Sequence, residues 1–168
     1  MNKIYLDNAS TTPISKEVKI EIDKYMMDEF GNPNSIHVLG VSARKAVEEA
    51  RKKISLAFNS HSDEIIFNSG GTEGNNAAIF GVFNHLIKSG LKYSDMRAIT
   101  SNIEHSSVLE CFKELESRGV AVDYAPAEKN GIIDPQKIKR LLKPETVLVS
   151  VMYANNEIGT IQPIREIA

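Results

Sequence analysis

Short apolar runs alternate with amphipathic segments from about residue 64 onward, and this alternation restricts the fold more than any other feature. Runs rich in β-branched and aromatic residues are typical of strands, and apolar residues spaced three or four apart are typical of helices. Strands are expected at 64–67, 97–101, 120–124 and 147–152, and helices at 73–87, 107–117, from Asp134–Pro135 and from about Pro163. The pattern predicts βαβ units, which form a parallel sheet with helices on both faces.

The run Val147–Met152 is apolar throughout, which is typical of a strand buried on both faces. The first 60 residues are instead mainly helical. A short strand and polar turn are expected over Asn2–Pro13, a helix from about Ser15 to the loop Gly31–Asn34, and a second helix over 42–58. The predicted fold is α/β, a three-layer α/β/α arrangement with a mainly parallel sheet, preceded by a helical N-terminal segment that packs on the sheet region.

Composition excludes several functional classes. The net charge is −2, which gives no basic surface for nucleic acid. Cys111 is the one cysteine, so the chain forms no internal disulfide and has no CxxC pair for zinc, and a cytoplasmic location is expected. No apolar run approaches the roughly 20 residues of a membrane span, and the opening residues do not form a secretory signal.

Polar clusters follow three of the predicted strands. They are Ser69–Glu73, Glu104–His105 and Asn155–Glu157. Ligands of open parallel sheets bind at the carboxyl ends of the strands. We therefore expect any ligand site of this chain to be assembled from these clusters.

The first cluster contains a Gly-Gly turn between a strand and a helix. Gly70 and Gly71 allow a sharp turn and close approach to a ligand, and Thr72 adds a hydroxyl donor. The free N–H groups of a helix N-terminus favour an anion such as phosphate. The segment has neither the Gly-Lys-Ser/Thr of a P-loop nor a GxGxxG pattern. On position alone, a purely structural turn remains the alternative to a phosphate site.

His105 is expected in or near the first turn of a helix, where the helix dipole disfavours imidazolium. A neutral imidazole there could stack on an aromatic ligand or transfer a proton, or it could be a surface or capping residue. Asn155 and Asn156 follow the most apolar strand, where their amides could bind a ligand oxygen or form an Asx-turn. Cys111 lies in an amphipathic helix and is predicted to be a buried thiol rather than a nucleophile.

Six segments together resemble cysteine desulfurases, which are PLP-dependent enzymes of fold type I related to class V aminotransferases. The resemblance extends over the whole chain, in the family's order, and is greatest to the branch that supplies sulfur to iron–sulfur scaffolds and tRNA thiolation. The segments are Tyr5–Pro13, Phe30–His37, Ser69–Asn76, Glu104–His105, Asn130–Asp134 and Asn155–Gly159. One departure from the family pattern is Gly74, where the family often has Ser or Ala.

This resemblance implies roles for four residues. Gly71 and Thr72 would bind the phosphate of pyridoxal 5′-phosphate (PLP), and Asn155 would contact the phenolic oxygen of the cofactor or the substrate. His105 would stack on the pyridine ring and move protons on the substrate amine, as the catalytic residue of this set. No metal is implied. Residues 1–15 would belong to the small-domain region and residues 16–168 to an incomplete PLP-binding large domain.

Three functional groups of the family have no counterpart in this sequence. They are the Asp that pairs with the pyridine nitrogen, the Lys of a Ser-Gly-His-Lys run that binds PLP covalently, and the mobile-loop Cys that accepts sulfur. Covalent PLP chemistry requires that lysine amine, and the ring needs its nitrogen partner to act as an electron sink. The chain alone is therefore expected to be inactive.

The leading hypothesis is the N-terminal half of a desulfurase that converts L-cysteine to L-alanine and an enzyme persulfide. The resemblance implies a homodimer for the complete enzyme, a sulfur-acceptor or scaffold protein as partner, and a possible C-terminal polypeptide that complements this one. The alternatives are a non-catalytic remnant or binding module, and a fragment of a class V aminotransferase or selenocysteine lyase.

The family fold also has a consequence for stability. There, strands from the C-terminal half lie between the strand before the phosphate turn and the next three strands. The predicted strand 64–67 would then have no neighbour, and its backbone donors would remain unpaired. The isolated chain is therefore expected not to fold stably in the family geometry.

Overall fold

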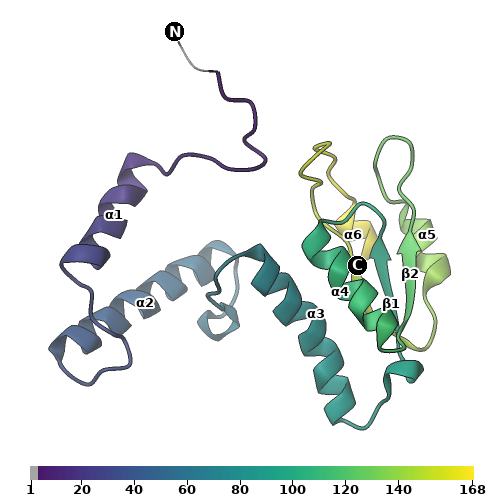
Figure 1. Cartoon of the computed structure of the whole chain (residues 1–168), viewed down its shortest axis with the longest axis horizontal. Helices are drawn as coiled ribbons and strands as arrows, with labels where there is room; N and C mark the ends of the chain where they lie inside the picture. The colour runs from purple at the N-terminus through teal and green to yellow at the C-terminus, as the bar shows by residue number, and fades with distance from the viewer. Residues whose placement is uncertain (1–3) are drawn as a thin grey trace. The chain divides into compact units, whose positions relative to one another are not determined.

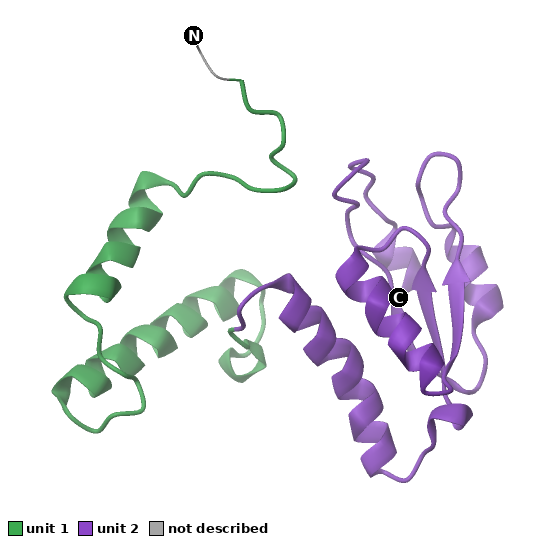
Figure 2. Ribbon diagram, in the orientation of Figure 1, with its two compact units in different colours: residues 1–67 green, residues 68–168 purple. Residues whose placement is uncertain are grey.

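The computed structural model describes residues 4–168 and separates the chain into two compact units, residues 1–67 (unit 1) and 68–168 (unit 2) (Figure 2). Unit 1 holds two of the longer helices, and unit 2 holds the sheet (Figure 1). The predicted division at residue 15 into a small-domain segment and a large domain stays a prediction. No helix among residues 4–168 combines the length and the apolar character needed to cross a membrane.

Unit 1 contains helices α1 (Lys16–Met27) and α2 (Val38–Ala57). Ser15 begins α1 as predicted, because its Oγ accepts a hydrogen bond from the Val18 N–H at 3.3 Å. Helix α2 begins four residues before the predicted position. The reason is His37, whose Nδ1 accepts from the Gly40 N–H at 3.4 Å; histidine is not one of the usual helix-capping residues.

The strand predicted over Asn2–Pro13 is wrong for the part of that segment that the structure describes. Residues 4–13 contain a turn at 8–10 and no strand; Asn2 and Lys3 lie outside the described residues. The Ser10 and Thr11 N–H groups donate to the Asp7 carbonyl, and the Ser10 hydroxyl donates to the Asp7 carboxylate at 2.8 Å. Local bonds of this kind compete with strand pairing.

The strand predicted at 64–67 is also wrong. A 3₁₀ turn, η1 (Ser62–Glu64), is followed by an extended segment that pairs with no strand among the described residues. Arg51 of α2 donates to the Ile65 carbonyl, and its guanidinium lies 4.8 Å from the centre of the Phe67 ring. The Ile66 side chain is 78% exposed. The β-rich sequence thus gives extended backbone without a sheet, because a strand needs a neighbour.

Unit 2 follows the predicted alternation closely. Its elements are α3 (Gly71–Lys88), η2 (Tyr93–Asp95), β1 (Arg97–Ser101), α4 (Ser106–Ser117), β2 (Ala121–Ala125), α5 (Pro135–Leu141), β3 (Thr146–Ser150) and α6 (Ile164–Ile167). Asp134 caps α5 as expected, with its carboxylate accepting from the Gln136 N–H at 2.9 Å.

The three strands form a parallel sheet in the order β2-β1-β3, which confirms the predicted sheet type. Arg97 of β1 is in register with Ala121 of β2, and Ser101 with Ala125, so the two strands end together. The chain passes from β1 to β2 on one side and then crosses to β3 on the other. The crevice between β1 and β3 is thus a topological switch point, where ligands of such sheets bind.

Separate apolar cores cover the two faces of the sheet. On one face Ala98 of β1 packs with Phe83 of α3 and Phe112 of α4, and all three are fully buried. On the other face Ile99 packs with Ile138 of α5. Neighbouring strand residues point to opposite faces, so the two cores explain the three-layer arrangement within unit 2 (Figure 1).

Strand β3 differs from its prediction. It ends at Ser150 rather than 152, and its residues are not buried on both faces: Val149 is 36% exposed and Val147 and Leu148 are half-buried. The cause is its position at the edge of the described sheet, where its one neighbour among residues 4–168 is β1. An apolar run indicates a buried strand only when layers cover both of its faces.

Candidate functional site

The Gly-Gly turn leads directly into α3. Gly70 is the N-cap, with φ 157° and ψ 177°, a backbone conformation that residues with a Cβ rarely adopt. A Cβ placed on Gly70 or Gly71 would meet nothing within 4 Å. The turn is therefore fixed by backbone conformation and is open on its outer side.

Three consecutive backbone N–H groups at this turn have no hydrogen-bond acceptor within residues 4–168: those of Gly71, Thr72 and Glu73. The first helical bond runs from the Gly74 N–H to the Gly70 carbonyl at 3.1 Å. Free donors at the positive end of a helix dipole attract anions. Thr72 is exposed, so its hydroxyl is also accessible.

Glu73 occupies one side of the same turn. Its carboxylate accepts hydrogen bonds from the Ser69 hydroxyl at 2.5 Å and the Ser69 N–H at 2.8 Å. These bonds, the hydroxyl first, lower the pKa of the Glu73 carboxyl below its ordinary value. Glu73 thus fixes Ser69 and directs the incoming chain, while the N–H groups of Gly71 and Thr72 remain available.

His105 is the N-cap of α4, in the position expected from the sequence. Its Nδ1 lies 2.8 Å from the Ser107 Oγ and accepts from the Ser107 N–H at 3.1 Å. An Nδ1 that accepts leaves the proton on Nε2, which gives a neutral ring. The side chain is exposed, so the Nε2 side of the ring faces solvent or a ligand.

Asn75 and Ser107 connect the helix that follows the Gly-Gly turn to His105. The Asn75 Nδ2 donates to the Ser107 Oγ at 2.8 Å, which joins the N-terminal parts of α3 and α4. Ser107 therefore contacts both Asn75 and His105. No role was predicted for Ser107, whose one signal in the sequence is its position two residues after His105.

Asn155 lies beyond the end of β3 and is 9% exposed. Its Oδ1 accepts from the N–H groups of Glu157 (2.9 Å) and Ile158 (3.0 Å), and its Nδ2 donates to the Ile103 carbonyl at 2.9 Å. The Asx-turn interpretation is thus observed. One amide N–H contacts only the Met152 sulfur, at 3.4 Å, which is a weak acceptor. That N–H can still bind a ligand oxygen.

The carboxyl end of β1 brings His105 and Asn155 close together, because Ile103 precedes His105 by two residues and binds Asn155. Within residues 4–168, no direct hydrogen bond links the side chains of Thr72, His105 and Asn155. Their connections run through Ser107 on one side and Ile103 on the other.

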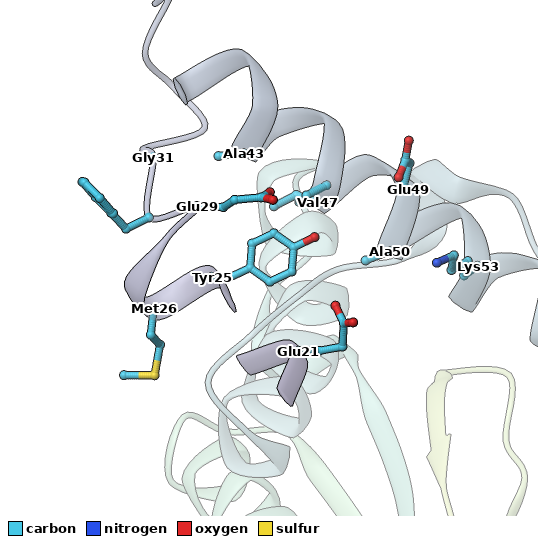
Figure 3. Close-up of a pocket in the computed structure, with 12 residues that line it drawn as sticks. Glu21, Tyr25, Met26, Glu29, Gly31, Ala43, Val47, Glu49, Ala50 and Lys53 are labelled. Atoms are coloured by element: carbon cyan, nitrogen blue, oxygen red, sulfur yellow. The ribbon is translucent and has the colours of Figure 1, made fainter. Parts of the chain in front are cut away.

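Of two grooves in the structure, one lies apart from this site and the other adjoins it. In unit 1, a groove of about 610 Å³ lies between α1 and α2, and Figure 3 shows the Tyr25 ring projecting from α1 toward Val47. None of its lining residues was predicted to be functional. In unit 2, a groove of about 410 Å³ between α3 and α4 includes Thr72 and Ser107 at its border.

Cys111 is a buried thiol, as predicted. It is 3% exposed, and burial raises the pKa of the thiol above its ordinary value. The thiol donates to the Ser107 carbonyl, with Sγ and the oxygen 3.1 Å apart. A protonated thiol packed against the core of the sheet is a poor nucleophile.

Comparisons with known proteins agree with the resemblance seen in the sequence. The cysteine desulfurase IscS of Dictyoglomus turgidum is 48% identical over 166 residues, which cover 99% of this chain and 41% of that protein. The cysteine desulfurase IscS of Methanosarcina thermophila is 43% identical over 98% of this chain and 39% of its own length. The chain thus spans about two fifths of the length of these relatives.

Solved structures show the same fold. A NifS-like protein superposes with a TM-score of 0.88 at 35% identity, over 95% of this chain and 44% of that one. SspA in complex with cysteine superposes with a TM-score of 0.86 at 36% identity, with the same coverage. The sequence profile of the family described as aminotransferase class-V matches residues 4–168. The chain therefore belongs to the aminotransferase class-V family and shares its sequence pattern with the family's cysteine desulfurases.

Proposed function

We propose that this chain is the part of a PLP-dependent cysteine desulfurase that binds the cofactor phosphate and frames the cofactor ring. The hydrogen bond between Asn75 and Ser107 supports this most strongly. It joins a turn with free N–H donors to the helix that carries His105, so an anion and a flat ring of one ligand can be held together. Class V relatives that are cysteine desulfurases make PLP the chemically consistent ligand.

The residues present fit the phosphate of such a cofactor. The N–H groups of Gly71 and Thr72, with the Thr72 hydroxyl, would donate to phosphate oxygens, and the α3 dipole would favour the negative charge. The absence of atoms within 4 Å of a Cβ on Gly70 or Gly71 leaves room for a phosphate against the backbone. Glu73 is compatible because its carboxylate is already bound to Ser69.

His105 and Asn155 would act on the ring. The neutral imidazole of His105 would stack on the pyridine, and its Nε2 could exchange a proton with the substrate amine. The weakly bonded amide N–H of Asn155 would donate to the phenolic oxygen. PLP, when bound, supplies an electron sink for carbanion chemistry.

Turnover requires groups that this sequence does not supply. No Ser-Gly-His-Lys run occurs in it, and Cys111 is buried. We propose that the missing Lys, Asp and Cys come from a C-terminal polypeptide, and that together the two parts convert L-cysteine to L-alanine and a persulfide on the missing Cys. The persulfide sulfur would then pass to an acceptor or scaffold protein, and the complete enzyme would be a homodimer in the cytoplasm.

Reconstitution tests this proposal. The chain is mixed with a polypeptide corresponding to the remaining three fifths of a related desulfurase, together with PLP and L-cysteine. We expect the visible absorbance band of PLP bound covalently to lysine, and alanine release that neither part gives alone. The matched control is the same polypeptide with its lysine replaced by alanine. A mixture with no band, while a full-length relative shows one, would contradict the proposal and favour a non-catalytic remnant.

A further inference from the structure

Glu104 is a buried acid for which neither the motifs nor the proposed function provides a role. It lies between β1 and α4 and is 7% exposed. Its Oε1 accepts two hydrogen bonds, from the Ser101 hydroxyl at 2.6 Å and the Met152 N–H at 2.8 Å. Its Oε2 accepts none from residues 4–168. The second bond joins residues 48 apart in the chain, and it links the ends of the neighbouring strands β1 and β3.

The two bonds of Glu104 join the chain segments that carry His105 and Asn155, the residues proposed to frame the ring. Ser101 is the last residue of β1, and Glu104 directly precedes His105. Met152 follows β3 and precedes Asn155 by three residues. A second bond, from the Asn155 Nδ2 to the Ile103 carbonyl at 2.9 Å, joins the same two segments. The two tips are thus joined at two points across the switch point of the sheet.

Removing the Glu104 link would leave the segment after β3 joined to the end of β1 by the Asn155 bond alone. Residues 151–155 belong to no strand apart from an isolated bridge between Ala154 and Ile161, so few other backbone bonds hold them to β1. Buried donors without an acceptor are costly, so loss of the carboxylate would displace Met152 toward solvent. Asn155 would move with it. Burial also raises the pKa of the Glu104 carboxyl, despite the bonds from Ser101 and Met152, so the site does not favour a charge there.

We propose that Glu104 is a positioning residue, whose side chain fixes the distance between His105 and Asn155 by tying the end of β1 to the segment after β3. It would act through the segments that its bonds to Ser101 and Met152 join, and not by contact with the ligand. This inference rests on the proposed function for the identity of the ligand. The connection itself is a property of the chain that can be measured without any ligand.

The experiment compares Glu104→Ala with Glu104→Gln in the full 168-residue chain. The glutamine carbonyl can accept both bonds that Oε1 accepts, and its amide group takes the place of Oε2, which has no partner. Glu110→Ala is the control, because Glu110 is an exposed acid on α4 paired with Lys113. Two probes are titrated: pyridoxamine 5′-phosphate, whose amine does not react with lysine, and inorganic phosphate. Hydrogen exchange of the Met152 amide is followed in parallel.

We expect Glu104→Ala to weaken pyridoxamine phosphate binding roughly tenfold and to leave phosphate binding unchanged, because the Gly70–Thr72 turn is untouched. Met152 exchange should accelerate about tenfold or more, and Glu104→Gln should restore both values. Equal loss of the two probes would indicate general disruption and overturn the inference, as would no change at all.

If the unsubstituted chain binds neither probe, the proposed function fails, and Met152 alone then decides the role of Glu104. Protection that is lost in Glu104→Ala and kept in Glu104→Gln upholds the connection between the two strand ends. A Met152 amide that is unprotected in the unsubstituted chain, or unaffected by Glu104→Ala, overturns it.

Discussion

Heating the isolated 168-residue chain in a calorimeter should give no single unfolding transition of the size normal for a domain of its length. Globular proteins absorb about 0.7 kcal/mol per residue near 60 °C, or about 120 kcal/mol for this chain. We expect less than about half of that. Helix α1 has no buried residue, and α2 buries only Gly40, Ala43 and Ser55. The extended segment after η1 pairs with no strand within residues 4–168.

Hydrogen exchange shows which elements of the isolated chain are stably folded. Amides of α1 should exchange nearly as fast as in an unfolded chain, because helices of 12 residues are marginal without tertiary packing. Amides of β1, such as Ile99, lie in the centre of the sheet between two cores and should be the most protected. A full-size cooperative transition with α1 and β1 equally protected would contradict the prediction that the chain alone does not fold stably in the family geometry.

Replacing Gly70 by alanine should weaken the binding of pyridoxamine 5′-phosphate about tenfold. At φ 157° and ψ 177°, a residue with a Cβ is strained by about 1–3 kcal/mol, and relief of that strain turns the N–H groups of Gly71 and Thr72 away from the phosphate. A penalty of about 1.4 kcal/mol corresponds to a factor of ten in affinity. Isothermal titration calorimetry measures the affinity.

The matched control is Gly81→Ala. Gly81 lies within the same helix, α3, and a Cβ there also meets nothing within 4 Å, but its backbone is helical. Alanine should therefore stabilise α3 by about 1 kcal/mol and leave affinity unchanged. If both variants bound with the affinity of the unsubstituted chain, Gly70 would be a structural glycine only, as its position alone allowed.

Secondary structure was predicted most accurately where the local sequence pattern and the tertiary environment favour the same element. The β1 strand at 97–101 and the starts of α1 and α5 were predicted correctly, because Ser15 and Asp134 act through local hydrogen bonds. The segment 64–67 has the composition of a strand, yet pairing depends on a neighbour that composition does not reveal. Val147–Met152 was misjudged for the same reason, since an apolar run does not show which strand lies at the edge.

The candidate site was predicted in part. The rule that ligands bind at the carboxyl ends of parallel strands selected the segments carrying Thr72, His105 and Asn155, and their functional roles stay a prediction. The contacts that join them could not be read from the sequence. Ser107, which contacts His105, binds Asn75 across 32 residues, and Glu104 binds Met152 across 48. Such long-range bonds follow from the crossover topology and the register of the sheet.

A titration of the unsubstituted chain with pyridoxamine 5′-phosphate, followed by nuclear magnetic resonance, tests most directly whether these residues form one ligand site. Three signals should shift together and saturate at one concentration: the Thr72 backbone amide, the His105 imidazole and the Asn155 side-chain amide. Signals of the groove between α1 and α2, such as Tyr25, should not move. Shifts at Thr72 with none at His105 and Asn155, or saturation at separate concentrations, would contradict a shared site.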